Sequence, residues 1–200
     1  MNRFYRVLHV IFWPLFQLLF PFTVSGLENL PKDRAVVLCA NHASAIDPVT
    51  ICFALPRQVP VRIMAKKELF ERPFLRWLIT KLGAFPIDRG HSDLNGVKTA
   101  IKAVRDGQNL LVFPEGTRVE REGQVEPKGG VVMIAMRTGA PLLPVYVGDK
   151  RKLFHRTHVV FGELYEPHTA TRHGTAEEYQ AYAEEVVRRA YALGKTAEKR

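Results

Sequence analysis

The chain has 200 residues, of which 46% are hydrophobic and 24% are charged. That length can bury one core but hardly two, so a single domain is expected. The formal net charge of +9 and the pI near 9.8 favour acidic partners such as nucleic acid, anionic lipid or phosphorylated substrates. Two cysteines, Cys39 and Cys52, are too few for a disulfide framework and lack metal-binding spacing, which is typical of a reducing compartment.

The first 25 residues form a hydrophobic segment that we expect to associate with a membrane. Residues 7–24 are almost wholly apolar and follow Arg3 and Arg6. A helix of that length would reach about 27 Å, short of a hydrocarbon core of roughly 30 Å. An interfacial helix is therefore favoured over a spanning one. A signal peptide cleaved near Ser25 and a helix buried in the core are the alternatives.

From residue 34 onward, short apolar runs alternate with amphipathic helices, which is typical of an α/β domain. We predict one domain over residues 26–200, with helices flanking a mixed, mostly parallel sheet. The expected strands are 35–40, 61–65, 84–87, 110–113, 142–147 and 158–161. A helix is expected over 92–106, capped by Ser92 and stopped at Gly107. Thr175 and Glu178 form a capping-box pattern for the last helix.

Four sequence clusters are expected where strands end, which is where open α/β sheets bind their ligands. They span residues 41–48, 83–89, 113–118 and 141–145.

The first cluster holds a possible base and its partner, His42 and Asp47. Residues five apart point in different directions on a regular helix, so these two can meet only if the chain turns between them. Asp47 before Pro48 is typical of a helix N-cap, which makes residues 43–46 a loop. A carboxylate there could fix the tautomer of the imidazole and leave its other nitrogen as a base. The alternative is that Asp47 merely caps its helix.

The second and third clusters favour a phosphate group. Arg89 and Arg118 each offer a planar fork for phosphate oxygens, Gly116 allows close backbone approach, and Thr117 adds a hydroxyl donor. Glu115 could orient Arg118 or receive a substrate hydroxyl. Solvated turns are the alternative for both clusters.

Together the four clusters resemble a known family. Asn-His-x-x-x-x-Asp, Phe-Pro-Ile-Asp-Arg, Phe-Pro-Glu-Gly-Thr-Arg and the proline-centred strand, in this order, are similar to the glycerolipid acyltransferases of the 1-acylglycerol-3-phosphate acyltransferase type. The stretches 64–70 and 127–130 are also similar to that family, and the resemblance spans about residues 26–165.

The resemblance implies a site and a reaction. His42 would be the general base and Asp47 its partner, while the acceptor's phosphate would be bound by Arg89, Glu115, Gly116, Thr117 and Arg118, with Lys66, Lys67 and Lys128 as the next candidates. An acyl chain would pass from acyl-CoA or acyl carrier protein to a lysophospholipid hydroxyl, without a metal or another cofactor. The expected product is phosphatidic acid, made on the cytosolic face of a membrane.

Other interpretations are open at this point. Cys39 could be a nucleophile, although a buried strand residue is favoured. His155 and His158 lack the other ligands of a metal site. A basic cluster, Lys150 to Lys152 with Arg156, could face lipid, the donor carrier or only solvent. A nucleic-acid module, a non-catalytic lipid-binding protein and an acyltransferase for another lysolipid are the competing functions.

Overall fold

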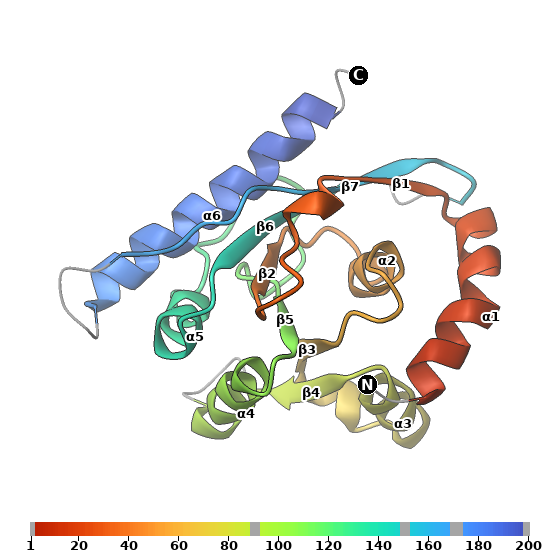
Figure 1. Cartoon of the computed structure of the whole chain (residues 1–200), viewed down its shortest axis with the longest axis horizontal. Coiled ribbons are helices and arrows are strands. Elements are labelled where there is room, and N and C mark those ends of the chain that lie inside the picture. The colour runs from red at the N-terminus through yellow and green to blue at the C-terminus, as the bar shows by residue number, and fades with distance from the viewer. Residues whose placement is uncertain (1–2, 89–92, 149–152, 169–173, 198–200) are drawn as a thin grey trace.

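The computed structural model describes residues 3–88, 93–148, 153–168 and 174–197, and in them seven strands form one sheet (Figure 1). The sheet order is β1-β7-β6-β2-β5-β3-β4. Neighbouring strands are parallel except for β6 and β7, so the predicted mixed, mostly parallel sheet is confirmed. The strands are β1 Phe22–Ser25, β2 Val37–Ala40, β3 Val61–Lys66, β4 Ala84–Ile87, β5 Asn109–Val112, β6 Leu142–Val147 and β7 Thr157–Phe161.

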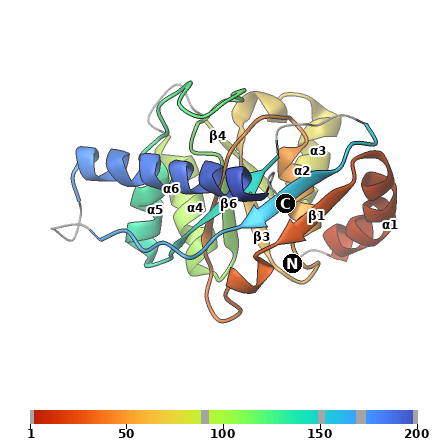
Figure 2. The same cartoon turned by 90° about the horizontal axis from the view of Figure 1, so that it is seen from above.

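Helices cover both faces of the sheet (Figure 2). They are α1 Arg3–Leu19, α2 Asp47–Ala54, α3 Pro73–Lys81, α4 Leu94–Arg105, α5 Gly130–Thr138 and α6 Ala176–Ala197, with 3-10 turns at Leu27–Asn29 and Lys67–Phe70. One core lies between the sheet and α4, α5 and α6, and the other lies under α2 with α1 and α3 at its margin. The central strands β2 and β6 are buried along their whole length because both their faces are covered.

All six predicted strands are present, with ends that differ by a few residues from the prediction. The sequence reading missed β1, which pairs in parallel with β7 from Phe22 opposite Thr157. A strand of four residues at the end of a long apolar stretch shows no alternating hydrophobic pattern of its own, so it could not be distinguished from the rest of that stretch. The sheet therefore begins at Phe22, inside the segment that we assigned to the membrane.

The first residues of α4 and α6 show whether the predicted capping residues are correct. Asp93, and not Ser92, caps α4, because the Asp93 carboxylate accepts a hydrogen bond of 2.8 Å from the Gly96 amide. Ser92 itself lies outside the described residues. The capping box of α6 is confirmed in both directions: the Glu178 amide donates to the Thr175 hydroxyl, and the Thr175 amide donates to the Glu178 carboxylate.

The helix α1 packs on the domain through one side only. Tyr5 donates a hydrogen bond to the Cys52 carbonyl, and the rings of His9 and Phe16 contact Phe53. Its other side carries seven exposed apolar residues: Val7, Val10, Ile11, Phe12, Trp13, Leu15 and Leu18. Among the described residues, no helix has the combined length and apolar character that crossing a bilayer would require.

Candidate active site

The C-terminal ends of five parallel strands meet at one edge of the sheet. Clusters 41–48 and 113–118 follow β2 and β5 at this edge, as predicted, and cluster 83–89 contains the whole of β4, with Asp88 after its C-terminal end. Cluster 141–145 does not belong there. It forms the start of β6 at the opposite edge and is buried between β2 and β7, because its prolines and leucines serve the core.

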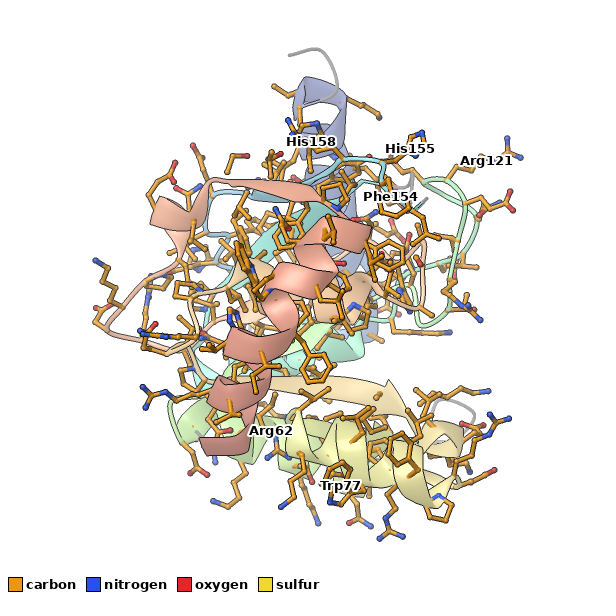
Figure 3. The ribbon with its side chains drawn as sticks, turned by 90° about the vertical axis from the view of Figure 1, so that its right-hand side faces the viewer. Arg62, Trp77, Arg121, Phe154, His155 and His158 are labelled. Carbon is orange, nitrogen blue, oxygen red and sulfur yellow. The ribbon has the colours of Figure 1, made fainter. Side chains whose placement is uncertain are left out.

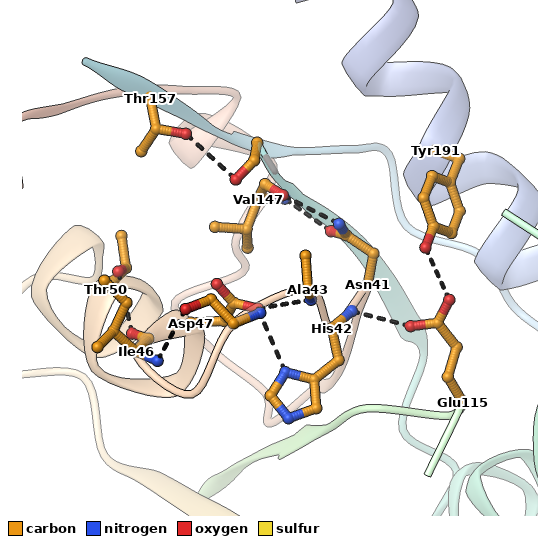
Figure 4. Close-up of polar contacts among 12 residues, drawn as sticks. Asn41, His42, Ala43, Ile46, Asp47, Thr50, Glu115, Val147, Thr157 and Tyr191 are labelled. Atoms are coloured by element: carbon orange, nitrogen blue, oxygen red, sulfur yellow. Dashed lines mark hydrogen bonds and ion pairs between the residues drawn. The ribbon is translucent and has the colours of Figure 1, made fainter. Parts of the chain in front are cut away.

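His42 and Asp47 meet as the sequence predicts (Figure 4). The His42 Nδ1 atom lies 3.2 Å from Asp47 Oδ2, and the Asp47 side chain is completely buried. The same carboxylate oxygen accepts hydrogen bonds from the amides of Ala43, at 2.8 Å, and Ser44, at 2.6 Å. The loop 43–46 thus wraps around the carboxylate and brings the imidazole to it.

Asp47 is the first residue of α2 and not its N-cap, so this detail of the prediction is wrong. Its carboxylate turns back toward the preceding loop, where three donors hold it. Pro48 still stands in the first turn, where its missing amide proton costs nothing. The partial positive charge of the helix N-terminus also attracts a negatively charged side chain at this position.

The imidazole of His42 is fixed on two sides. An ionised carboxylate can only accept hydrogen bonds, so Nδ1 carries the proton and Nε2 is the basic nitrogen of the neutral ring. Nε2 points away from Asp47 (Figure 4). Phe113, at the end of β5, stacks on the ring with centroids 4.1 Å apart. The ring is therefore held in one orientation, with Nε2 directed away from Asp47.

Glu115 has a different position from the one that we expected for a phosphate ligand. It is only 4% exposed. Its Oε2 accepts a hydrogen bond of 2.8 Å from the His42 amide, and its Oε1 accepts one of 2.8 Å from the Tyr191 hydroxyl. Burial raises the pKa of Glu115, although both hydrogen bonds act against that shift. The geometry makes Glu115 a support for the backbone of His42 (Figure 4).

Three supporting residues were missed by the sequence reading. Asn41 joins the ends of β2 and β6 through two hydrogen bonds with the backbone of Val147, at 2.9 and 2.7 Å. Phe113 supplies the stacking ring, and Tyr191 reaches the site from α6. Asn41 and Phe113 are part of the two motifs that contain His42 and Glu115, and this position in the sequence could have indicated a role in the site. Tyr191 is one tyrosine on a long helix, and nothing near it in sequence indicates its partner.

The remaining candidates of the third cluster lie together on the surface beside the pair. Gly116 has φ of +69°, and its amide closes a turn onto the Phe113 carbonyl at 3.0 Å. Thr117 and Arg118 follow it and are exposed. The Lys128 side chain lies next to Gly116, and its backbone amide donates to the Pro114 carbonyl at 2.7 Å. These four residues form one polar, basic corner.

Lys66 and Lys67 lie at the C-terminal end of β3. Lys66 forms an ion pair of 3.3 Å with Glu68, and Lys67 forms one with Asp88. The Asp88 carboxylate raises the pKa of Lys67. Arg89, one position after Asp88, lies outside the described residues.

The competing chemistries find little support in the described part of the chain. Cys39 is buried in β2, and burial raises the pKa of its thiol, so it is inert as a nucleophile. His155 and His158 bond to the Leu153 carbonyl and the Thr23 hydroxyl. Within the described residues, no cluster of three histidine, cysteine or acidic side chains could hold a metal ion. Of the basic cluster, Arg156 is exposed and residues 150–152 lie outside the described ranges.

Comparison with known proteins gives concordant results. The family model described as Acyltransferase matches residues 21–148. A 1-acyl-sn-glycerol-3-phosphate acyltransferase of Bacillus subtilis is 38% identical over 122 residues, which are 60% of this chain and 59% of that protein. One of Streptococcus pneumoniae is 36% identical over 125 residues, 60% of this chain and 45% of that protein. The chain therefore spans about half the length of the curated relatives that it matches.

A solved structure extends the likeness over most of the fold. The crystal structure of the 1-acyl-sn-glycerophosphate (LPA) acyltransferase PlsC from Thermotoga maritima superposes with a TM-score of 0.69 at 28% sequence identity. The match covers 96% of this chain and 78% of that one.

Proposed function

Because this chain belongs to the acyltransferase family, we propose that it moves a fatty acyl chain from a thioester donor to the free hydroxyl of 1-acyl-sn-glycerol 3-phosphate, giving phosphatidic acid. The observation that carries the proposal is the His42–Asp47 pair, with its contact of 3.2 Å and with Nε2 pointing away from Asp47. The names of the relatives support the proposed identity of the acyl acceptor, and the geometry of the His42–Asp47 pair supports acyl transfer assisted by a general base.

The reaction needs one base and a good leaving group. The acceptor hydroxyl attacks the thioester carbonyl while Nε2 of His42 takes its proton, so a C–O bond forms and the C–S bond then breaks. Asp47 stabilises the imidazolium that results, and its contacts with the Ala43 and Ser44 amides keep it in place. The departing thiolate is stable enough to leave unaided, and it then takes the proton from the His42 imidazolium, which regenerates the neutral base. We propose that neither a metal nor another cofactor takes part.

The phosphate of the acceptor would bind in the basic corner. We assign this role to Gly116, Thr117, Arg118 and Lys128, with Arg89 as the second arginine and with Lys66 and Lys67 as further candidates. Lys66 and Lys67 rank behind Arg118 because each already forms an ion pair, while no ion pair joins Arg118 to another described residue. Glu115 serves the site from behind, by holding the His42 backbone.

The donor and the location complete the proposal. Acyl-CoA or acyl carrier protein would supply the thioester, and the enzyme would work on the cytosolic face of a membrane, where that donor is present. The exposed apolar side of α1 would hold it there, as an interfacial helix does.

A thiol-release assay tests the proposed function. Purified protein would be mixed with acyl-CoA and, separately, with acyl carrier protein loaded with the same chain, and free thiol would be followed with a thiol-reactive dye. We expect release that depends on added lysophosphatidate and that disappears in its absence. Release at the same rate without an acceptor would indicate a thioesterase, and no release with any lysolipid would favour a non-catalytic lipid-binding protein.

A further inference from the structure

An aromatic side chain forms part of the candidate active site itself. Trp77 on α3 and Phe154 before β7 are exposed on the surface (Figure 3), whereas Phe113 is only 5% exposed. The Phe113 ring stacks on the His42 imidazole with centroids 4.1 Å apart and an angle of 29° between the two planes. A buried aromatic ring in this position covers one face of the proposed base, so its electronic character bears on the chemistry.

The segment that carries Phe113 contacts His42 at its ring and at both of its backbone groups. Besides the ring contact, the Glu115 carboxylate accepts a hydrogen bond of 2.8 Å from the His42 amide. The Val119 amide donates one of 2.8 Å to the His42 carbonyl. The Gly116 amide closes a turn onto the Phe113 carbonyl at 3.0 Å, and the Phe113 side chain packs against the core under α2. The backbone and the packing of Phe113 therefore fix its ring against the imidazole.

The imidazole meets Asp47 and, in the proposed reaction, the acceptor hydroxyl at its edge, through Nδ1 and Nε2. The His42 side chain is only 12% exposed, so water does little to solvate a charge that develops on its ring. The face of a phenyl ring carries partial negative charge and attracts a cation that lies within about 6 Å of the ring centroid. The stack of 4.1 Å places an imidazolium at His42 well inside that limit.

We infer that Phe113 is a positioning residue for the reaction, and that the face of its ring stabilises the positive charge that develops on His42 as Nε2 takes the proton of the acceptor hydroxyl. An aliphatic side chain of similar size could also hold the imidazole by packing, but it has no such face. The phenyl ring thus favours the imidazolium over the neutral ring, and it adds to the effect of Asp47 from a second direction.

The inference rests on the proposed function, because a charge on His42 speeds the reaction only if His42 is the base. The test changes the charge of the ring face and keeps the shape of the ring. Phe113 would be replaced by a series of ring-fluorinated phenylalanines up to pentafluorophenylalanine, since fluorine withdraws electron density from the face and finally reverses its charge. The same series at Phe161, which is 1% exposed in β7, is the matched control. Phe113→Leu is a second variant that removes the face but keeps an apolar side chain.

We expect kcat to fall in step with fluorination of Phe113, by about 2- to 30-fold at the end of the series, while KM for the acceptor and Tm stay nearly unchanged. Phe113→Leu should lose a similar factor in kcat. The Phe161 series should keep the wild-type kcat, because its ring is remote from the charge that forms. Packing alone would not produce a graded loss, since fluorination leaves the ring in place.

Protonation of the His42 ring gives a second readout that needs no turnover. In histidine-labelled protein, the NMR signals of this ring would be followed against pH. Every variant keeps the titratable groups that face His42, which are Asp47 of α2 and Glu115 with Tyr191 of α6 behind it. We expect the midpoint of protonation to lie at lower pH with pentafluorophenylalanine at position 113 than with phenylalanine, because the imidazolium loses the support of the ring face.

The two readouts separate the inference from the proposed function. An unchanged kcat across the fluorinated series, or an unchanged midpoint of protonation, would overturn the inference. A wild type that transfers no acyl chain would count against the proposed function alone. The midpoints would then still decide whether the Phe113 ring stabilises a charge on His42.

Discussion

At the scale of single residues, the site depends on one buried carboxylate. Asp47 Oδ2 faces three donors: the His42 ring, the Ala43 amide and the Ser44 amide. A charge that is buried in this way is stable because each contact satisfies it. The same contacts fold the loop and orient the proposed base, so one carboxylate serves both the local structure and the proposed chemistry.

Asp47→Asn tests whether the charge itself is needed. The amide oxygen of asparagine can still accept from the Ala43 and Ser44 amides, but it cannot stabilise an imidazolium on His42. We expect kcat to fall by at least about 10²-fold while the protein remains folded. Steady-state kinetics and a thermal melt measure the two effects. Near-normal kcat in the folded variant would assign Asp47 a structural role only.

Arginine at the basic corner should set selectivity for a phosphate-bearing acceptor. Arg118→Lys and Arg89→Lys keep the charge but lose the planar fork that can grip two oxygens. A charge-assisted contact is worth about 1.5 to 3 kcal/mol, so kcat/KM for lysophosphatidate should fall about 10- to 150-fold. The same measurement with neutral monoacylglycerol is the control. An unchanged ratio between the acceptors in both variants would show that these arginines do not bind the phosphate, with Lys66, Lys67 and Lys128 next to be tested.

At the scale of secondary-structure elements, the last helix reaches back to the first motif. At Gly194, α6 lies so close to β6 that an added Cβ would come within 2.3 Å of the Tyr146 ring. Tyr191, one turn earlier, therefore reaches Glu115, which in turn holds the His42 amide. A residue of the last helix thus helps to hold the proposed base, which follows β2 early in the domain.

Tyr191→Phe should change how activity depends on pH. The Tyr191 hydrogen bond lowers the pKa of Glu115, so its loss raises that pKa further above the ordinary value. The ionised carboxylate is the better acceptor for the His42 amide, so the acid side of the kcat/KM profile should move to higher pH. We also expect about a tenfold lower kcat. If kcat/KM fell at every pH while the acid side of the profile stayed at the same pH, Tyr191 would not act through the ionisation of Glu115.

Glu115→Gln should change how the stability of the protein depends on pH, because the buried Glu115 carboxyl can ionise and glutamine cannot. Its pKa in the folded protein is raised above the ordinary 4.5, so its stabilising contribution is complete below that value and is lost as pH rises through the raised pKa. Glutamine does not ionise. The variant should therefore gain stability relative to the wild type as pH rises across this window. Urea midpoints at about pH 4 and about pH 7 measure it, and a constant difference would contradict it.

The sequence predicted the elements that carry a local signal and missed those that depend on distant partners. Buried strands such as β2 and β6 are continuous apolar runs, and the turn after His42 follows from Asp47-Pro48, so both could be foreseen. The strand β1 exists because β7 is beside it, and the role of Glu115 depends on Tyr191, 76 positions away. Neither partner is visible in a local pattern.

At the scale of the whole molecule, α1 belongs both to the domain and to the proposed membrane contact. Its inner side contacts Phe53 through His9 and Phe16, and β1 follows it directly. Deleting the first 25 residues would therefore remove a strand as well as an apolar surface. Substitutions on the outer side of the helix separate the two roles.

Ile11→Gln with Leu18→Gln should weaken membrane association without unfolding the protein. Both side chains are largely exposed on α1, so little packing is lost, while roughly 1.5 to 3 kcal/mol of burial in lipid is removed at each. Vesicle flotation and a thermal melt give the two readouts. Phe16→Ala is the matched inner-side variant and should lower Tm instead. Undiminished vesicle binding by the outer-side variant would show that α1 does not contact lipid.

The most direct measurement is product formation by wild type and His42→Ala, with lysophosphatidate and either thioester donor, read by mass spectrometry. We predict phosphatidic acid carrying the donor's acyl chain from the wild type. His42→Ala should be at least about 10²-fold slower, with acceptor binding and Tm nearly unchanged, because the base acts in the transition state. Phosphatidic acid formed at a near-normal rate by His42→Ala would contradict the account.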